Sequence, residues 1–420
     1  MSAVRVIGLA SATRRPRWHE RIARRISAAA LGAIREGRLV LRDAEGAQSF
    51  GSASAPGRTM PAIEATVHVS DPSFYLDLLL GGSVGAGSAY AKGKWGSSDT
   101  TALCRLLLRN IEVLHRADGP WSALTAAVRR IGYRGRRNTK RGSRRNIEAH
   151  YDLGNDFFSL LLDPTLSYSA AKFDRPEMTL EEASLAKLDG ILTLLELPPG
   201  SRLLEIGTGW GGFALRATGT GGLDVTTTTI SPRQAALARK RLDDAGLAAR
   251  ARVLEQDYRD LAGLYDGLVS IEMIEAVGAE YYDDYFRLCA ARLRPGAPFI
   301  LQAIVIEDDA FEAARRDVDF IKWHIFPGSC IPSRAVLVAA AERAGFTTER
   351  EVDLTASYGE TLRRWRSNLH ANRARIQALG FDDAFIRLWD FYFCYSEAGF
   401  EERHTRDLQI RFRKKETPGR

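Results

Sequence analysis

The sequence predicts an α/β protein built on a doubly wound parallel sheet, with a small α+β domain ahead of it. Three observations predict the sheet. A short apolar run, Arg202 to Ile206, leads into a turn rich in glycine. Three further strand-like runs follow, and stretches of helical character separate them. Strands that alternate with helices are typical of a parallel sheet, which binds its ligand at the carboxyl ends of its strands.

The glycine turn lies in LLEIGTGWGGFA, Leu203 to Ala214. Gly207 and Gly209 carry no Cβ, so the backbone can turn sharply there and approach a ligand closely. A helix beginning near Gly211 would point its N-terminal amides at that ligand. The glycines also match the GxGxxG spacing of a dinucleotide site, so the turn alone does not decide between the two kinds of ligand.

The later strand-like runs help to decide between a dinucleotide site and another kind of ligand site. The three runs are Asp224 to Ile230, Ala251 to Leu254 and Tyr265 to Ile271. An acid and an aromatic, Asp257 and Tyr258, follow the second of these runs. The set resembles a class I S-adenosylmethionine (SAM) methyltransferase. The alternative is a nicotinamide or flavin site, which should have a ribose-binding acid at the tip of the first of these runs, where this chain has Thr229, Ile230 and Ser231.

The composition is that of a globular protein. A chain of 420 residues suits two domains, or three, and a hydrophobic content of 45% can form a sizeable core. The four cysteines include no CxxC pair, so neither a zinc site nor a disulfide framework is predicted, and a reducing cytoplasm is expected. No apolar run approaches the roughly 20 residues that span a bilayer, and the N-terminus lacks the apolar core of a signal peptide.

The net charge of +7 and the pI of about 9.3 suggest an anionic partner. Nine of the 59 basic residues form one cluster: Arg129, Arg130, Arg134, Arg136, Arg137, Lys140, Arg141, Arg144 and Arg145. The cluster is either a solvated linker or a site of attraction for anionic lipid headgroups, worth about 1 kcal/mol per basic side chain near a membrane. Nucleic acid is not expected as a partner, because the cluster has only Tyr133 for stacking and no binding motif accompanies it.

We expect three parts along the chain: an α+β accessory domain over residues 1–124, associated with lipid or membrane, a basic linker over 125–145, and a methyltransferase domain over 146–420. Short strands are expected at Arg38 to Arg42 and at Ala65 to Val69. Helical segments are expected around Ser73 to Leu80 and Asp99 to His115.

A basic amphipathic stretch, Trp18 to Ile34, opens the accessory domain. Ile22, Ile26, Ala30 and Ala33 recur at helical spacing and form one apolar face. We expect this face to pack onto the domain that follows. Its alternative use is to lie on a membrane surface.

The segment NIEAHYDLGNDFFSLLLDPTLSYSAAKF, Asn146 to Phe173, resembles the opening of the cyclopropane-fatty-acyl-phospholipid synthase family. The resemblance continues through LLEIGTGWGGFA, TTISPRQ, SIEMIEAVG, DFIKWHIFPG and FYFCYSEAGFEER, and so covers essentially residues 146–415. The N-terminal domain, with GGSVGAGSAY from Gly81 to Tyr90, looks like the accessory domain of bacterial members that act on phospholipids. Several motifs in the right order are far more specific than any one of them.

The resemblance implies that SAM donates a methyl group to the double bond of an unsaturated phospholipid acyl chain, leaving a carbocation. Proton loss would then close a cyclopropane, or a hydride shift followed by proton loss would give a methylene branch. The cation needs a dry pocket with electron-rich walls, for which Phe157-Phe158, Trp323 and Phe391-Tyr392-Phe393 are candidates. For each of these taken alone, core packing is the favoured explanation. The implied location is the cytoplasm, peripheral to the inner face of the membrane, with an anionic membrane surface as partner. A homo-oligomer is left open.

The resemblance also assigns cofactor-binding residues by position. Glu205, Gly207 and Gly209 correspond to the site of the methionine and ribose ends of SAM. The remaining positions carried over for SAM are Tyr151, Tyr168, Ser169, Thr229, Gln234, Asp257 and Tyr258. Thr229, Gln234, Asp257 and Tyr258 have a plain structural alternative, as helix caps or surface residues.

Proton removal is where the chain departs from the family pattern. Many members hold a bicarbonate ion, taken to be the base, with a cysteine, a glutamate, a histidine and a tyrosine. Glu275 and Tyr358 match the glutamate and the tyrosine, but Ala170 replaces the cysteine and Gln302 the histidine. Gln302 can still donate a hydrogen bond to an anion. Glu275 is itself a candidate base, provided that an apolar pocket raises its pKa.

The substitutions favour methylene branching slightly over ring closure. Two other functions stay open: a methyltransferase for a soluble small molecule, and a lipid-binding relative with impaired catalysis. Methylation of nucleic acid is disfavoured, because the chain lacks a catalytic motif of the NPPY kind.

Overall fold

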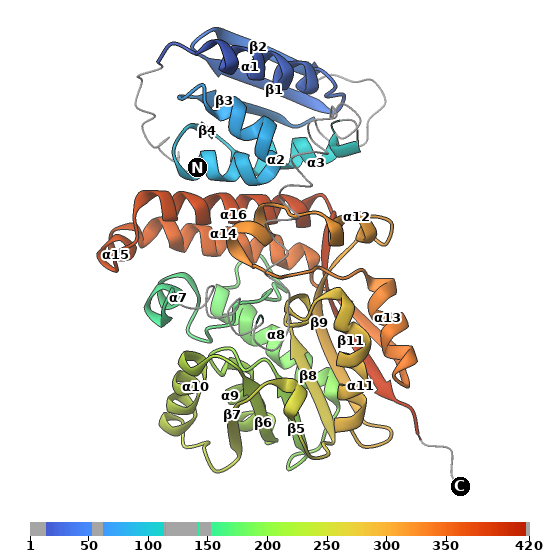
Figure 1. Ribbon diagram of the computed structural model, residues 1–420. Coiled ribbons are helices and arrows are strands. Elements are labelled where there is room, and N and C mark those ends of the chain that lie inside the picture. The colour runs from blue at the N-terminus through green and yellow to red at the C-terminus, as the bar shows by residue number, and fades with distance from the viewer. Residues whose placement is uncertain (1–13, 53–61, 113, 115–141, 143–152, 417–420) are drawn as a thin grey trace. The chain divides into compact units, whose positions relative to one another are not determined.

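The computed structural model describes residues 14–52, 62–112, 114, 142 and 153–416, and the chain divides into two compact units that are interleaved in sequence (Figure 1). The first unit consists of Met1–Arg134, Asp317–Ile325 and Arg373–His404, and the second of Gly135–Arg316, Phe326–Asn372 and Thr405–Arg420. Compactness therefore groups two late segments with the N-terminal part of the chain. The domain boundaries expected at residues 124 and 145 lie outside the described residues and stay a prediction.

The first unit combines a four-stranded sheet with helices. Its elements are α1 (Trp18–Leu31), β1 (Gly37–Asp43), β2 (Gly46–Ser52), β3 (Glu64–Val69), α2 (Phe74–Ala91), β4 (Trp95–Ser97), α3 (Thr100–Arg109), the π-helical turn η5 (Ile321–Ile325), α15 (Arg373–Ala378) and α16 (Asp383–Glu401). The sheet order is β2-β1-β3-β4, with β1 and β3 parallel. The two strands predicted in this region are confirmed, and α2 continues beyond its expected end through a kink at Gly82, whose φ of +54° suits glycine.

Helix α16 packs within this unit on residues from α2 and α3. The Tyr90 hydroxyl donates to Asp390 Oδ2 at 2.6 Å, and the Tyr90 and Phe391 rings lie 5.4 Å apart. The Thr101 hydroxyl donates to Glu397 Oε2 at 3.0 Å. A Cβ on Gly87 would lie 2.2 Å from the Phe320 ring, so this close approach requires glycine. These contacts show why the late segments belong to the first unit.

The expectation that the apolar face of Trp18 to Ile34 packs onto the domain that follows is wrong for Ile22 and Ile26, whereas Ala30 and Ala33 are half-buried. Ile22 and Ile26 are 47% and 43% exposed, and Trp18 is 74% exposed. The buried face of the helix carries Glu20 and Ala23 instead.

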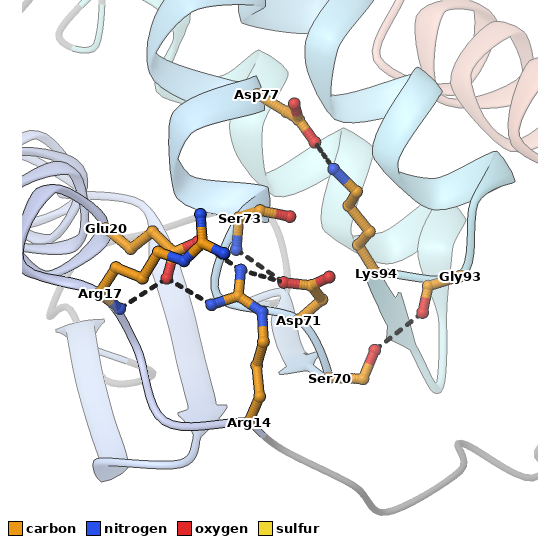
Figure 2. A network of polar contacts seen from close by, with 9 residues as sticks. All are labelled: Arg14, Arg17, Glu20, Ser70, Asp71, Ser73, Asp77, Gly93 and Lys94. Carbon is orange, nitrogen blue, oxygen red and sulfur yellow. Dashed lines mark hydrogen bonds and ion pairs between the residues drawn. The ribbon is translucent and has the colours of Figure 1, made fainter.

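An ion pair explains why α1 buries a glutamate. Figure 2 shows Arg14 beside Glu20, and its guanidinium donates to Glu20 Oε2 at 2.7 Å. The backbone N–H of Arg17 donates to the same oxygen at 2.7 Å, and Arg14 also contacts Asp71 at 3.1 Å. These donors hold the pKa of Glu20 down at about 2. Because its charge is compensated, Glu20 can face inward while the apolar residues face out.

The second unit contains a seven-stranded sheet flanked by helices. Its elements are α7 (Asn155–Leu161), α8 (Leu180–Leu195), β5 (Arg202–Ile206), α9 (Gly212–Gly219), β6 (Asp224–Thr229), α10 (Pro232–Asp244), β7 (Ala251–Glu255), η2 (Tyr258–Asp260), β8 (Gly267–Ile271), η3 (Ile274–Ala276), η4 (Ala279–Tyr281), α11 (Tyr282–Arg292), β9 (Pro298–Ile306), α12 (Phe311–Arg316), α13 (Arg334–Arg343), β10 (Phe346–Asp353), α14 (Thr355–Ala371) and β11 (Thr405–Lys414). The strand order is β10-β11-β9-β8-β5-β6-β7. Strands β7, β6, β5, β8 and β9 are parallel, and β11 and β10 add an antiparallel edge.

The predicted doubly wound sheet is confirmed. Neighbouring residues along a strand face opposite layers: Leu204 and Leu301 belong to the core with α11 and α13, whereas Leu203 and Ile300 belong to the core with α8 and α9. The strand order reverses between β5 and β8, and parallel sheets bind their ligands at the carboxyl ends of the strands at such a point. In the part of the chain that the structure describes, no helix is both long and apolar enough to cross a bilayer.

Candidate active site

The glycine turn joins β5 to α9 at the point where the strand order reverses. Gly207 and Gly209 have φ values of +103° and +50°, which glycine adopts without strain. The backbone N–H groups of Gly207 and Thr208 both donate to the Thr228 carbonyl at 3.0 Å, which fixes the turn against β6. A Cβ on Gly209 would meet nothing within 4 Å among the described residues, so space for a ligand lies beside the turn.

Glu205 lies buried just before this turn. Its Oε2 has no hydrogen-bond partner among the described residues. Burial raises its pKa to about 8, against the influence of Thr227 and the Lys187 charge. An orphaned carboxylate oxygen and an open glycine turn fit SAM, which carries an ammonium group at its methionine end and needs close backbone approach. SAM binding by Glu205, Gly207 and Gly209 stays a prediction.

Two predicted residues after β6 contact each other. The Thr229 hydroxyl donates to Gln234 Oε1 at 2.9 Å, and both side chains are buried. The Gln234 backbone N–H donates to the Ser231 hydroxyl at 3.3 Å, as in a helix cap. This pair therefore shapes the start of α10 at the carboxyl end of β6.

Asp257 and Tyr258 follow β7. The Asp257 carboxylate binds the Arg259 guanidinium at 2.8 and 2.7 Å and accepts from the Arg259 backbone N–H at 3.0 Å. The Tyr258 ring lies 5.6 Å from that of Tyr285, and the Arg259 guanidinium lies 5.4 Å above it. Both side chains thus have a structural role at η2, and their contact with adenine stays a prediction.

Tyr168 belongs to a cluster of aromatic side chains. Its ring lies 5.3 Å from Phe158 and 5.1 Å from Trp365, and Phe158 lies 4.8 Å from Trp210. Tyr358 joins at 6.3 Å from Trp365. We call these five residues the aromatic cluster. Their ring faces can attract a cation.

The other predicted aromatic residues are divided between the units. Phe157 and Phe158 lie in the second unit, whereas Trp323 and Phe391-Tyr392-Phe393 lie in the first. The predicted Tyr151 lies outside the described residues, as does the whole basic cluster from Arg129 to Arg145.

Ser169 contacts a buried lysine that the sequence analysis did not single out. The Lys187 ammonium donates to the Ser169 hydroxyl at 2.7 Å, and Lys187 is only 1% exposed. Burial lowers the pKa of Lys187, whereas the Glu272 and Asp407 carboxyl groups act to raise it. A buried ammonium surrounded by acids offsets negative charge in this part of the unit.

Gln302 and Tyr358, predicted to act in catalysis, meet at one carboxylate. The Tyr358 hydroxyl donates to Glu272 Oε2 at 2.6 Å. The Gln302 amide donates to Glu272 Oε1 and to Asp407 Oδ2, each at 2.8 Å. Its oxygen accepts from the Gln409 amide at 3.1 Å, so the orientation of Gln302 is fixed.

Glu275 is buried close to these groups in the sequence and in the fold. Its Oε1 accepts from the Ile304 backbone N–H at 2.6 Å, and its Oε2 has no hydrogen-bond partner among the described residues. Burial, and then the neighbouring Glu272 charge, raise the pKa of Glu275 to about 8. The environment of Glu275 therefore raises its pKa, as a general base at neutral pH requires. Its role as the base stays a prediction.

Sequence reasoning missed Glu272, Asp407 and Lys187. Lys187 carried a usable signal, because it shares the buried face of α8 with Ala183 and Ile191, four residues to either side. A lysine in phase with buried positions needs a partner. Glu272 and Asp407 carried no such signal, since their partners lie far away in the sequence.

The two raised pKa values predict how the stability of the ligand-free protein depends on pH. Glu205 and Glu275 titrate near pH 8 when folded but near 4.5 when unfolded, so the folded state binds more protons in between. The free energy of unfolding should fall as pH rises through this range, by at most about 1.4 kcal/mol per pH unit for each group. Urea unfolding at several pH values should give a shallower fall for Glu275→Gln. The exposed Glu181→Gln should keep the wild-type slope, and an equal slope for both variants would contradict the assignment.

The sheet order, the glycine turn at its reversal point and the carboxyl groups of Glu272 and Glu275 after β8 are the features of a class I SAM-dependent methyltransferase. The family described as mycolic acid cyclopropane synthetase matches residues 138–410, and the chain belongs to this family. It is 36% identical over 327 residues to the tuberculostearic acid methyltransferase UfaA1 of Mycobacterium tuberculosis, covering 76% of either chain. It is 32% identical over 357 residues to the cyclopropane-fatty-acyl-phospholipid synthase of Escherichia coli, covering 83% of this chain and 87% of that one.

Solved structures agree with the family. The mycolic acid cyclopropane synthase CmaA1, in complex with S-adenosylhomocysteine (SAH) and CTAB, matches with a TM-score of 0.60 and 33% identity over 64% of this chain and 98% of that chain. The cyclopropane synthase MmaA2 from Mycobacterium tuberculosis gives 0.61 and 31% over the same shares. The protein is thus an enzyme that uses SAM as its methyl donor.

Proposed function

We propose that the protein transfers a methyl group from SAM to the double bond of an unsaturated acyl chain in a membrane phospholipid. The product would be a cyclopropane or methylene-branched chain formed through a carbocation. The observation that carries the proposal is the combination of the aromatic cluster with buried acids next to the glycine turn. Tyr358 belongs to the cluster and binds Glu272, and a Cβ on Gly207 would lie 3.4 Å from Met273, the residue after Glu272.

The side chains suit a cationic intermediate. SAM supplies the electrophilic methyl group. The ring faces of the aromatic cluster stabilise a positive charge that develops on the alkene, and their burial keeps out water that would otherwise trap it. Phe158 and Trp365 are almost fully buried, so these two rings are shielded from water. An anionic carboxylate close by stabilises the same charge.

The exposed face of α1 supports a membrane surface as the partner. Trp18, Ile22 and Ile26 recur every four residues, so they form one apolar stripe on a helix. Arg21 and Arg25 are exposed beside them. A helix with an apolar stripe and flanking arginines is suited to lie in the headgroup region of an anionic bilayer, and the basic cluster beyond the described residues adds to this attraction.

The decisive experiment offers the full-length protein trideuteromethyl SAM and vesicles of an unsaturated phosphatidylglycerol. Mass spectrometry of the acyl chains should show a gain of one carbon and two deuterium atoms, because one deuteron leaves after transfer. Proton NMR of the product made with unlabelled SAM then separates the two products. A methylene branch shows the vinylic protons of its =CH2 group, whereas a cyclopropane shows high-field protons of its ring CH2 group. No gain of carbon on any vesicle would overturn the proposal.

Control reactions separate the alternatives. Transfer to a soluble acceptor without vesicles would identify a small-molecule methyltransferase, and SAM binding without any transfer would identify an impaired lipid-binding relative. The triple variant with Trp18→Ser, Ile22→Ser and Ile26→Ser should have lower activity on anionic vesicles and unchanged SAM affinity. Leu264 is as exposed as Ile22 and Ile26, so Leu264→Ser is the control and should leave activity unchanged.

A further inference from the structure

Glu272 has an unusual backbone at a functional position. It directly follows β8, at the carboxyl edge of the sheet, and its φ is +46°. Such a conformation is uncommon and strained for a residue with a side chain, and strained residues of this kind gather at active sites. The Glu272 backbone N–H donates to the Gln302 carbonyl at 2.8 Å, which holds the residue in this conformation.

The Glu272 carboxylate accepts hydrogen bonds from three separate parts of the chain. The backbone N–H of Ala170 and the Gln302 amide donate to Oε1 at 2.7 and 2.8 Å. The Tyr358 hydroxyl donates to Oε2 at 2.6 Å. Three donors that converge in this way form a preorganised site for an anion. In this protein the Glu272 side chain itself occupies that site.

Of the three acids Glu272, Glu275 and Asp407, Glu272 accepts the most hydrogen bonds. Glu275 and Asp407 each accept one side-chain hydrogen bond within the described residues, from the Ile304 N–H and the Gln302 amide. Burial raises the pKa of Asp407 well above its usual value and that of Glu275 to about 8. Burial raises the pKa of Glu272 too, but Tyr358, Ala170, Lys187 and Gln302 all oppose it.

The residues around Glu272 do not fit a bicarbonate ion. The resemblance places such an ion between positions 170, 275, 302 and 358 of this chain. Here the donors at 170, 302 and 358 all bind Glu272. A bicarbonate ion would find these donors taken and would meet a carboxylate of like charge.

We infer that the Glu272 carboxylate takes the place of a bound anion and accepts the proton that leaves the transferred methyl group. The inference rests on the proposed function. In the first step the alkene π electrons form the new bond to the methyl carbon, the carbon–sulfur bond breaks with its electrons staying on sulfur, and the second alkene carbon becomes positive. Glu272 then removes a proton from the new methyl group, and the released electron pair closes the ring. After a hydride shift, the same proton transfer leaves a methylene double bond.

The test compares two variants of Glu272 in the full-length protein, in buffer freed of carbon dioxide. Wild-type activity should not change when sodium bicarbonate is added. Glu272→Gln keeps the shape of the side chain but cannot accept a proton, so kcat should fall at least about 100-fold with SAM affinity unchanged. Glu272→Gly relieves the strained backbone and vacates the place of the carboxylate, so its equally low activity should be restored, saturably, by sodium bicarbonate or sodium formate.

A matched control is available at Glu196, a glutamate that also has a positive φ, of +53°, but is exposed at the end of α8. Glu196→Gly should keep wild-type activity and show no response to either anion. Equal activity of Glu272→Gln and wild type, a wild-type requirement for bicarbonate, or no anion response in Glu272→Gly beyond that of Glu196→Gly would each overturn the inference.

Thermal unfolding supplies a readout that needs no turnover. Bicarbonate and formate should raise the Tm of Glu272→Gly, chloride at the same ionic strength should not, and Glu272→Gln and wild type should not respond to any of them. If the wild type methylates no vesicle, the proposed function fails. The anion-dependent Tm of Glu272→Gly still decides whether Glu272 fills an anion site, since an unchanged Tm would contradict it.

Discussion

Replacing Gly209 with valine is expected to weaken SAM binding at least about 100-fold, equivalent to roughly 3 kcal/mol. Gly209 has a φ of +50°, a conformation that strains any β-branched residue. The valine methyl groups would also fill the space beside the turn, where a Cβ meets nothing within 4 Å among the described residues. Isothermal titration calorimetry with SAM and SAH measures the loss directly.

Gly246 provides the matched control for this variant. Its φ of +69° is also positive, and a Cβ there likewise meets nothing within 4 Å among the described residues, but it lies after α10, away from the turn. Gly246→Val should therefore suffer a similar backbone strain and still bind SAM normally. If both variants lose SAM equally, strain rather than a ligand site beside Gly209 explains the effect.

Replacing Lys187 with methionine is expected to lower the free energy of unfolding by about 3 kcal/mol near pH 8 and by much less near pH 5. The buried ammonium offsets the negative charge of Glu272 and its neighbours. Without it the pKa of these acids in the folded state rises further, so the folded protein must take up protons that are scarce at high pH. Urea unfolding of both proteins at the two pH values gives the difference.

Lys240→Met is the corresponding surface control. The Lys240 side chain is 68% exposed and pairs with Asp244 one helical turn away. Its removal should change stability by less than about 0.5 kcal/mol at either pH. A Lys187→Met protein as stable as Lys240→Met at both pH values would show that the buried charge is compensated in another way.

The central part of the fold can be predicted from sequence because its signals are local. The apolar run of β5, the glycines after it and the start of α9 are contiguous, and each has a direct physical meaning. The antiparallel edge formed by β10 and β11 has no comparable signal, since β11 follows its neighbour β9 in the sheet only after about a hundred intervening residues. A short window of sequence does not indicate which distant strand such a strand will pair with.

Prediction of the candidate active site from local sequence has the same limit. Glu205 can be found from its place near the end of a strand, and Glu275 from its place after one. The role of Glu272 depends on Ala170, Gln302 and Tyr358, which lie in three other parts of the chain. The face of α1 was predicted wrongly for a related reason. Periodicity locates an apolar face but does not reveal that Arg14 neutralises Glu20 and so allows the opposite face to be buried.

The interleaving of the two units limits how this enzyme can be truncated or recombined with a relative, and how its segments can evolve. The polypeptide leaves one unit for the other after Arg134, Arg316, Ile325, Asn372 and His404. A truncated protein starting at the basic linker would lack Tyr90 and Thr101, whose hydroxyls bind Asp390 and Glu397 of α16. A functional chimaera between two relatives would need to exchange all three segments of the first unit at once. We therefore expect these segments to have evolved as a co-adapted set and not as a detachable module.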